Sequence, residues 1–127
     1  AGFLYDTSSP TADYQRNNES SNNGCCTLFP FMSDGLMVLP ITLPQDAAYF
    51  SLGKSPSAYW DYIFELIQTI KLWNGLAVVS THIQPHHSAS NEMLKGYGTL
   101  LEKLSHDEEA WFALPRDIVG QAISNYK

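Results

Sequence analysis

The stretch that decides the fold reads Leu36-Met37-Val38-Leu39-Pro40-Ile41-Thr42-Leu43-Pro44-Gln45-Asp46. It is apolar and partly β-branched, follows the turn-forming pair Asp34-Gly35, and is interrupted by prolines, which predicts a buried strand that ends near Pro40. Asp46 therefore falls just past the C-terminal end of this strand.

A helix and a second buried strand are predicted next along the chain. Residues 57–72 carry apolar side chains at helical spacing, with Ser55 suited to the N-cap and Pro56 to the first turn. After a Gly-containing helix end, residues 76–81 form a continuous apolar run, which is typical of a strand covered on both faces. His82 stands at the end of this run.

The rest of the chain extends the alternation. We expect a short strand at 2–5, a long polar loop at 7–27, a helix at 90–104, a short strand at 111–114 and a helix at 115–126. Strands that alternate with helices indicate an α/β fold in which parallel strands are covered by helices.

Composition limits the size of the protein and its partners. The chain has 127 residues, enough for one domain, and a formal net charge of -6 with no basic cluster. A nucleic acid is therefore not an expected partner. No apolar run approaches the roughly 18 residues that a membrane helix needs, and the sequence assigns no compartment.

Cysteine and tryptophan residues are expected to be structural. The adjacent pair Cys25 and Cys26 suits neither a normal disulfide nor a zinc site, so we expect reduced, buried thiols. The three tryptophans, Trp60, Trp73 and Trp111, lie among residues with helix or strand periods, which favours core positions over exposed sugar platforms.

Candidate functional residues follow the predicted strands. In parallel α/β folds, sites form at the C-terminal ends of strands, where Asp46, His82 and the pair His86-His87 lie. An imidazole at the end of an apolar strand needs partners for its ring nitrogens, which favours a functional role for His82. Asp46 could instead be a turn residue or a cap, and His86 and His87 could be solvated or cap the next helix. A metal site built from the three histidines is a further alternative.

Five stretches in this order resemble those of a known enzyme family. They are residues 2–8 (GFLYDTS), 24–31 (GCCTLFPF), 39–46 (LPITLPQD), 75–82 (GLAVVSTH) and 111–116 (WFALPR). Together they resemble the C-terminal half of a polysaccharide deacetylase of the NodB-homology type. The resemblance covers nearly the whole chain.

The resemblance implies a fold, a reaction and roles for residues. The fold would be part of a distorted (β/α)7 barrel, and the substrate an acetylated polysaccharide or glycan that loses N- or O-acetyl groups with the help of a divalent, zinc-like metal. His82 matches the histidine that protonates the leaving amine as general acid. Asp46 would be a second catalytic residue, and Thr81 and His86 would contact the substrate.

Departures from the family pattern limit what this chain could do alone. The chain has no Asp-Asp after a strand and no His-Ser-x-x-x-His, the motifs that supply the metal ligands and the base, and Ser80 stands where the family has an apolar residue. We therefore expect residues 1–127 to be the C-terminal portion of a deacetylase, with no tight metal binding and no activity alone. Its expected partner is the N-terminal half of the barrel or a second copy. The competing hypothesis is a non-catalytic carbohydrate-binding or assembly module.

Overall fold

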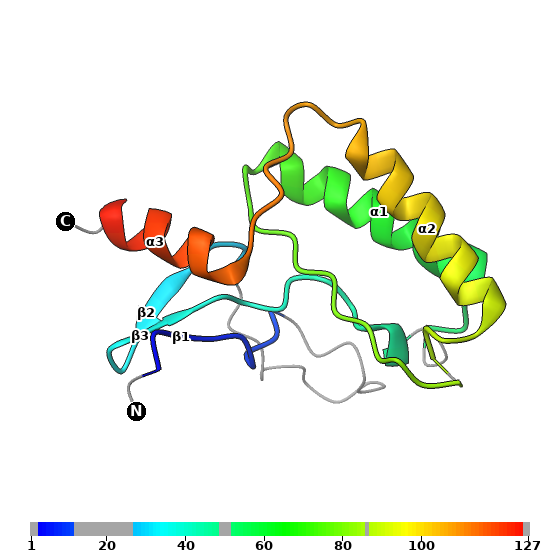
Figure 1. Ribbon diagram of the computed structural model, residues 1–127, viewed down its shortest axis with the longest axis horizontal. Helices are drawn as coiled ribbons and strands as arrows, with labels where there is room; N and C mark the ends of the chain where they lie inside the picture. Colours follow the sequence, from blue (N-terminus) through cyan, green and yellow to red (C-terminus); the bar gives the residue numbers. More distant parts are fainter. Residues whose placement is uncertain (1–2, 12–26, 49–51, 86, 126–127) are drawn as a thin grey trace.

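The structure is a computed structural model that describes residues 3–11, 27–48, 52–85 and 87–125 (Figure 1). It contains a small sheet, a short 3-10 helix and three α-helices. In chain order these are β1 (Tyr5–Asp6), β2 (Phe31–Ser33), β3 (Leu36–Val38), η1 (Asp46–Ala48), α1 (Pro56–Leu72), α2 (Asn91–Ser105) and α3 (Pro115–Asn125).

The sheet is mixed, with the order β1-β3-β2. β1 pairs with β3 in parallel, as expected, but β2 is an antiparallel neighbour that the sequence analysis did not predict. β2 and β3 form a hairpin around Asp34 and Gly35, whose φ angles of 50° and 80° are both positive, as a type I′ turn requires. The expected first strand at 2–5 overlaps β1 only at Tyr5, because β1 lies further along the chain, and the second strand, expected to end near Pro40, ends at Val38.

The helices begin where their capping residues predict. Ser55 and Ser90 accept hydrogen bonds from the backbone N–H groups of Ala58 and Met93, each at 3.3 Å. α1 and α2 lie side by side (Figure 1) and enclose the larger apolar core. Its buried members are Leu43, Tyr59, Trp60, Ile63, Ile67, Ile70, Met93, Leu100 and Leu104.

The third helix packs on the sheet rather than on the other two helices. Val119 of α3 is buried against Met37 and Leu39 of the central strand region, with Leu76 and Ile118 at the edge of this second core. Figure 1 shows α3 beside β2 and β3, at the opposite end of the molecule from the N-terminus of α2. The two cores are joined by the long extended segment that follows α1.

This extended segment is the main departure from the predicted strands. Residues 76–81 form no strand; instead the backbone N–H of Leu76 donates to the carbonyl of Leu28 at 2.8 Å, and that of Val78 donates to Oγ1 of Thr42 at 2.9 Å. The segment therefore runs beside residues 41–46, but a side chain occupies the place of a backbone acceptor (Figure 1). A regular ladder needs backbone acceptors on both sides, so the predicted strand does not form. The prediction that it would be covered on both faces is also wrong, because Ala77 is exposed and the other residues of 76–81 are only half-buried.

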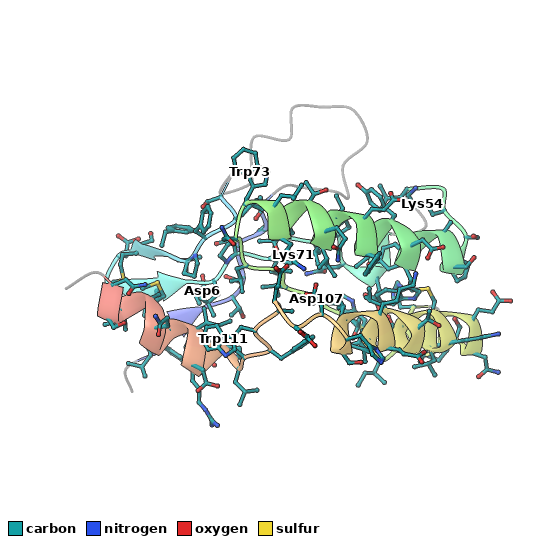
Figure 2. All side chains as sticks on the ribbon, turned by 90° about the horizontal axis from the view of Figure 1, so that it is seen from above. Asp6, Lys54, Lys71, Trp73, Asp107 and Trp111 are labelled. Atoms are coloured by element: carbon teal, nitrogen blue, oxygen red, sulfur yellow. The ribbon has the colours of Figure 1, made fainter. Side chains whose placement is uncertain are left out.

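Two further predictions, the strand at 111–114 and the core positions of Trp73 and Trp111, differ from the structure. Residues 111–114 also form no strand, and Trp73 and Trp111, expected in the core, are 68% and 64% exposed (Figure 2). Most of the polar loop at 7–27, with Cys25 and Cys26, lies outside the described residues. The part of the chain that the structure describes has no helix with the length and hydropathy to cross a membrane. The barrel stays a prediction.

Candidate functional site

Asp46 and His82 are brought together by the two extended segments that precede them. Asp46 is the first residue of η1 and its side chain is fully buried. The chain before it is fixed by Tyr59 of α1, whose hydroxyl donates to the carbonyl of Pro44 at 2.8 Å. His82 ends the segment that runs beside residues 41–46. The site thus lies where α1, η1 and the segment after α1 meet.

The Asp46 carboxylate is the centre of a small hydrogen-bond network. Its Oδ1 lies 2.6 Å from Nδ1 of His82, and its Oδ2 accepts the backbone N–H of His82 at 2.7 Å. Oδ2 also accepts from Ser88, from the backbone N–H at 3.2 Å and from the hydroxyl at 2.5 Å. One buried carboxylate therefore fixes both the backbone and the ring of His82 and holds the loop that leads into α2.

The network keeps this carboxylate ionised. Burial alone would raise the pKa of Asp46, but the hydrogen bonds from His82 and Ser88 outweigh it, and the pKa is lowered from its ordinary value. Because an ionised carboxylate only accepts hydrogen bonds, we assign the proton to Nδ1 of His82. Nε2, on the other edge of the ring, is then the nitrogen that can exchange a proton.

Tyr59 contributes a neutral donor to the same region. Burial, and then the nearby negative charge of Asp46, raise the pKa of its hydroxyl well above the usual range. The phenol therefore keeps its proton and its hydrogen bond to Pro44. Its role is to hold the backbone that carries Asp46.

The arrangement suits general acid–base chemistry at His82. The His82 side chain is 42% exposed while that of Asp46 is 0% exposed, so a molecule in solvent could reach the imidazole but not the carboxylate. An oriented imidazole whose Nδ1–H is fixed by a carboxylate can accept or donate a proton at Nε2. Asp46 is thereby placed to position the ring of His82 for this proton transfer.

Of the other predicted site residues, Thr81 and His87 lie next to this hydrogen-bond network, and His86 lies outside the described residues. Thr81 is half-buried directly before His82, but the Asp46 carboxylate binds His82 and Ser88 and not Thr81. The ring of His87 lies 5.7 Å from that of His82, centroid to centroid. His86 lies outside the described residues, so its expected substrate contact and the three-histidine metal site are not tested.

Ser88 is the residue that sequence reasoning missed. It is buried, and it is the second side chain that binds Asp46. In the sequence it stands in a polar loop among other serines, with no periodicity to mark it as buried. Only the close approach of the 82–88 loop to η1 gives it this function.

The described residues do not fit the divalent metal that the resemblance implies. Within residues 3–11, 27–48, 52–85 and 87–125, no group of three or more His, Cys, Asp or Glu side chains could hold a metal ion. Both oxygens of Asp46 and the Nδ1 of His82 are already engaged with each other and with Ser88. The network can therefore supply proton transfer, whereas metal ligands would have to come from other residues.

Comparisons with known proteins add no relative. No protein-family model, curated protein or solved structure matches the chain. Any functional assignment thus depends on the geometry above and on the sequence resemblance.

Proposed function

We propose that this chain is the C-terminal part of a carbohydrate deacetylase and supplies His82 as its general acid. The substrate would be an acetylated polysaccharide or glycan, and the reaction the hydrolysis of its N- or O-acetyl groups. The observation that carries the proposal is the contact of 2.6 Å between the buried Asp46 carboxylate and Nδ1 of His82. This contact orients the partly exposed imidazole of His82 for proton transfer.

The spacing of the contacts supports the proposal. Val78 binds Thr42 and His82 binds Asp46, and in both pairs the partners are 36 residues apart. The segments ending at Asp46 and His82 therefore run parallel and in register. This is the relationship that neighbouring strands of a (β/α) barrel would have, with both side chains at the same C-terminal end.

The chemical role of His82 is the proton transfer to the leaving group. When the tetrahedral intermediate of amide hydrolysis collapses, the C–N bond breaks and its electron pair stays on nitrogen. An amine anion is a very poor leaving group, so protonated His82 gives its Nε2 proton to this nitrogen as the bond breaks. His82 becomes neutral, keeps Nδ1–H on Asp46, and acetate and the free amine leave.

The attack of water is assigned to residues outside this chain. The described residues do not fit a metal site, and Asp46 is too buried to act as a base toward substrate. The proposed N-terminal half of the barrel would provide the metal ligands and the base that activates the water. Phe3 and Leu4, directly before edge strand β1, are 81% and 73% exposed, and such a neighbouring segment would cover them.

The test compares the wild type and two variants of the protein encoded by the complete gene. Acetate release from an N-acetylated chito-oligosaccharide is measured for the wild type, His82→Ala and His106→Ala. His106 is the matched control because it caps the opposite end of α2 from the site. We expect His82→Ala to lower turnover by about a hundredfold or more, as for loss of a general acid, and His106→Ala to leave it unchanged.

Two results would contradict the proposal. Nearly unchanged turnover in His82→Ala would make His82 structural. A complete gene without the Asp-Asp and His-Ser-x-x-x-His motifs, and a product that binds the oligosaccharide but releases no acetate, would instead support the non-catalytic binding module.

A further inference from the structure

A pocket on the pair α1 and α2 carries an unassigned polar group. Its volume is about 470 Å³, within the range of roughly 300–1,000 Å³ that small-molecule sites occupy. Trp60 lines it and is only 3% exposed, yet its indole Nε1–H has no hydrogen-bond partner among the described residues. A buried donor left without an acceptor is costly, so an acceptor supplied by a ligand would be favourable there.

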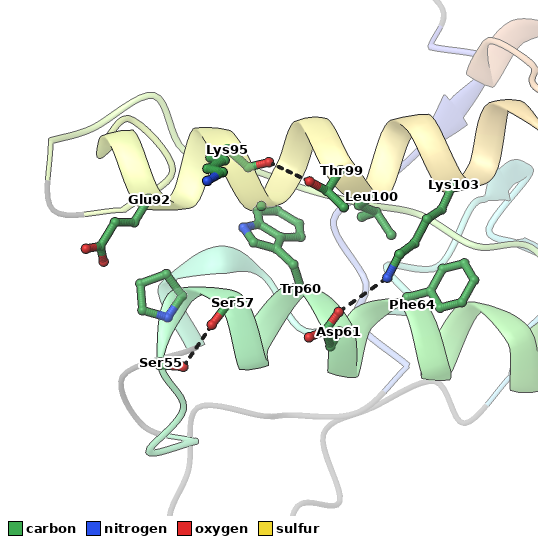
Figure 3. A pocket seen from close by; sticks show the side chains of 12 residues that line it. Ser55, Ser57, Trp60, Asp61, Phe64, Glu92, Lys95, Thr99, Leu100 and Lys103 are labelled. Carbon is green, nitrogen blue, oxygen red and sulfur yellow. Dashed lines mark hydrogen bonds and ion pairs between the residues drawn. The ribbon is translucent and has the colours of Figure 1, made fainter.

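The position of Trp60 is fixed by close packing against α2. A Cβ atom added at Gly96 would lie 2.3 Å from Cδ1 of the indole, so only glycine lets the ring lie against the helix backbone. The ring also packs against Tyr97, with centroids 5.1 Å apart. Figure 3 shows the indole nitrogen facing the end of the pocket where Glu92 and Lys95 lie. The donor is therefore held in one direction.

Four charged side chains line the pocket: Lys103 and Asp61 form an ion pair, whereas among the described residues Glu92 and Lys95, called here the open set, do not. Lys103 lies 3.4 Å from Asp61, across the two helices. Glu92 and Lys95, one turn apart on α2, take part in no ion pair in the part of the chain that the structure describes. The open set thus holds one negative and one positive charge near the indole N–H. At the opposite end of the pocket, the apolar side chains of Phe64 and Leu100 lie beside the Lys103–Asp61 pair, whose charges already neutralise each other (Figure 3).

We infer that this pocket binds a free α-amino acid with an apolar side chain. The carboxylate would accept from Nε1–H of Trp60 and pair with Lys95, and the ammonium group would pair with Glu92. The apolar side chain would pack toward Phe64 and Leu100. A zwitterion of this kind satisfies the buried donor and both open charges without leaving a net charge in the pocket. The inference is independent of the deacetylase proposal, because the pocket shares no residue with the Asp46 network.

The test is a titration of the isotope-labelled protein with L-leucine, followed through the indole N–H signals in ¹H–¹⁵N spectra. The chain has three tryptophans, and Trp60→Phe and Trp73→Phe assign their signals. We expect a saturable shift of the Trp60 signal only. The comparison ligands are 4-methylpentanoate, which lacks the ammonium group, 3-methylbutylamine, which lacks the carboxylate, and cellotriose.

Matched variants identify the contacts. Glu92→Gln should weaken leucine binding by about tenfold, the effect of one lost ion pair in a partly enclosed site. The control Glu102→Gln changes an exposed carboxylate of the same helix outside the pocket and should leave binding unchanged. No shift of the Trp60 signal, equal binding of 4-methylpentanoate, a stronger response to cellotriose, or an unaffected Glu92→Gln variant would each overturn the inference.

Discussion

The buried carboxylate of Asp46 binds both the backbone N–H and the ring Nδ1 of His82, a residue 36 positions further along the chain. Two extended segments that share few backbone hydrogen bonds are thus joined at their ends by one ionised side chain. The same contact fixes the proton on Nδ1, so structure and proposed chemistry depend on the same group.

Removal of this charge should destabilise the protein. In Asp46→Asn the amide nitrogen would face the donors of His82 or Ser88, and charge-assisted bonds would be lost, which predicts a fall in the free energy of unfolding of about 2–3 kcal/mol. Urea denaturation measures it. The control is Asp34→Asn, because Asp34 is exposed and asparagine tolerates its positive φ. Equal midpoints for the two variants would contradict the importance of the network.

Stability should also fall in acid because of Asp46. Its pKa is lowered in the folded state, so its contribution is fully present above the ordinary pKa of 3.8 and is lost as the pH falls through the lower folded value. We expect the wild type to lose stability as the pH falls from neutral through and below the ordinary value of 3.8, and Asp46→Asn to lose less over the same range. Denaturant midpoints measured across this range test the difference. Parallel curves for the two proteins would show that another carboxylate is responsible.

Two glycines of α2 should respond in opposite ways to alanine. In Gly96→Ala the new methyl group would meet the indole of Trp60 at 2.3 Å, and overpacking of this kind costs about 1–3 kcal/mol. In Gly98→Ala nothing lies within 4 Å, so the better helix propensity of alanine should stabilise the protein by about 0.5–1 kcal/mol. Chemical denaturation of both variants provides the comparison, and a stabilised Gly96→Ala would refute the close packing of Trp60.

An ion cluster ties the end of α1 to the segment between α2 and α3. Nζ of Lys71 lies 2.8 Å from Oδ1 of Asp107 (Figure 2) and 2.7 Å from Oε2 of Glu109. The hydrogen bonds to Asp107 and Glu109 raise the pKa of Lys71. Lys71→Met should lower the melting temperature at low ionic strength, and by less in high salt, because salt screens the lost attraction. Lys54→Met serves as the control, because Lys54 is half-buried and its Nζ lies over the ring of Tyr62 rather than against a carboxylate pair. A salt-independent loss would indicate a packing effect instead.

The sequence predicted local structure better than pairing. The starts of α1 and α2 were placed within a residue because Ser55 and Ser90 are strong N-caps, whose effect is local. The hairpin was missed, although Asp34-Gly35 between two short apolar runs is a known hairpin signal. Residues 76–81 and 111–114 were read as strands because they are apolar. Strand formation also needs a neighbour, which the residues themselves do not specify.

The candidate site was also predicted only in part, because contacts between distant segments are not specified by local sequence. Asp46 and His82 each follow an apolar run that was predicted to be a strand, and the C-terminal ends of parallel strands lie at the same edge of a sheet. The direct pairing of the two side chains was not predicted, and neither was Ser88, because both depend on how the loop after His82 folds back on η1. Burial of a carboxylate is a property of the tertiary structure, and no local sequence pattern predicts it.

The most direct test of the central claim is the rate of acetate release by the complete gene product with an N-acetylated chito-oligosaccharide, compared between His82→Ala and the His106→Ala control. We expect turnover to fall about a hundredfold or more in His82→Ala and to stay at the wild-type level in His106→Ala. Wild-type turnover in both variants would contradict the assignment of His82 as the general acid.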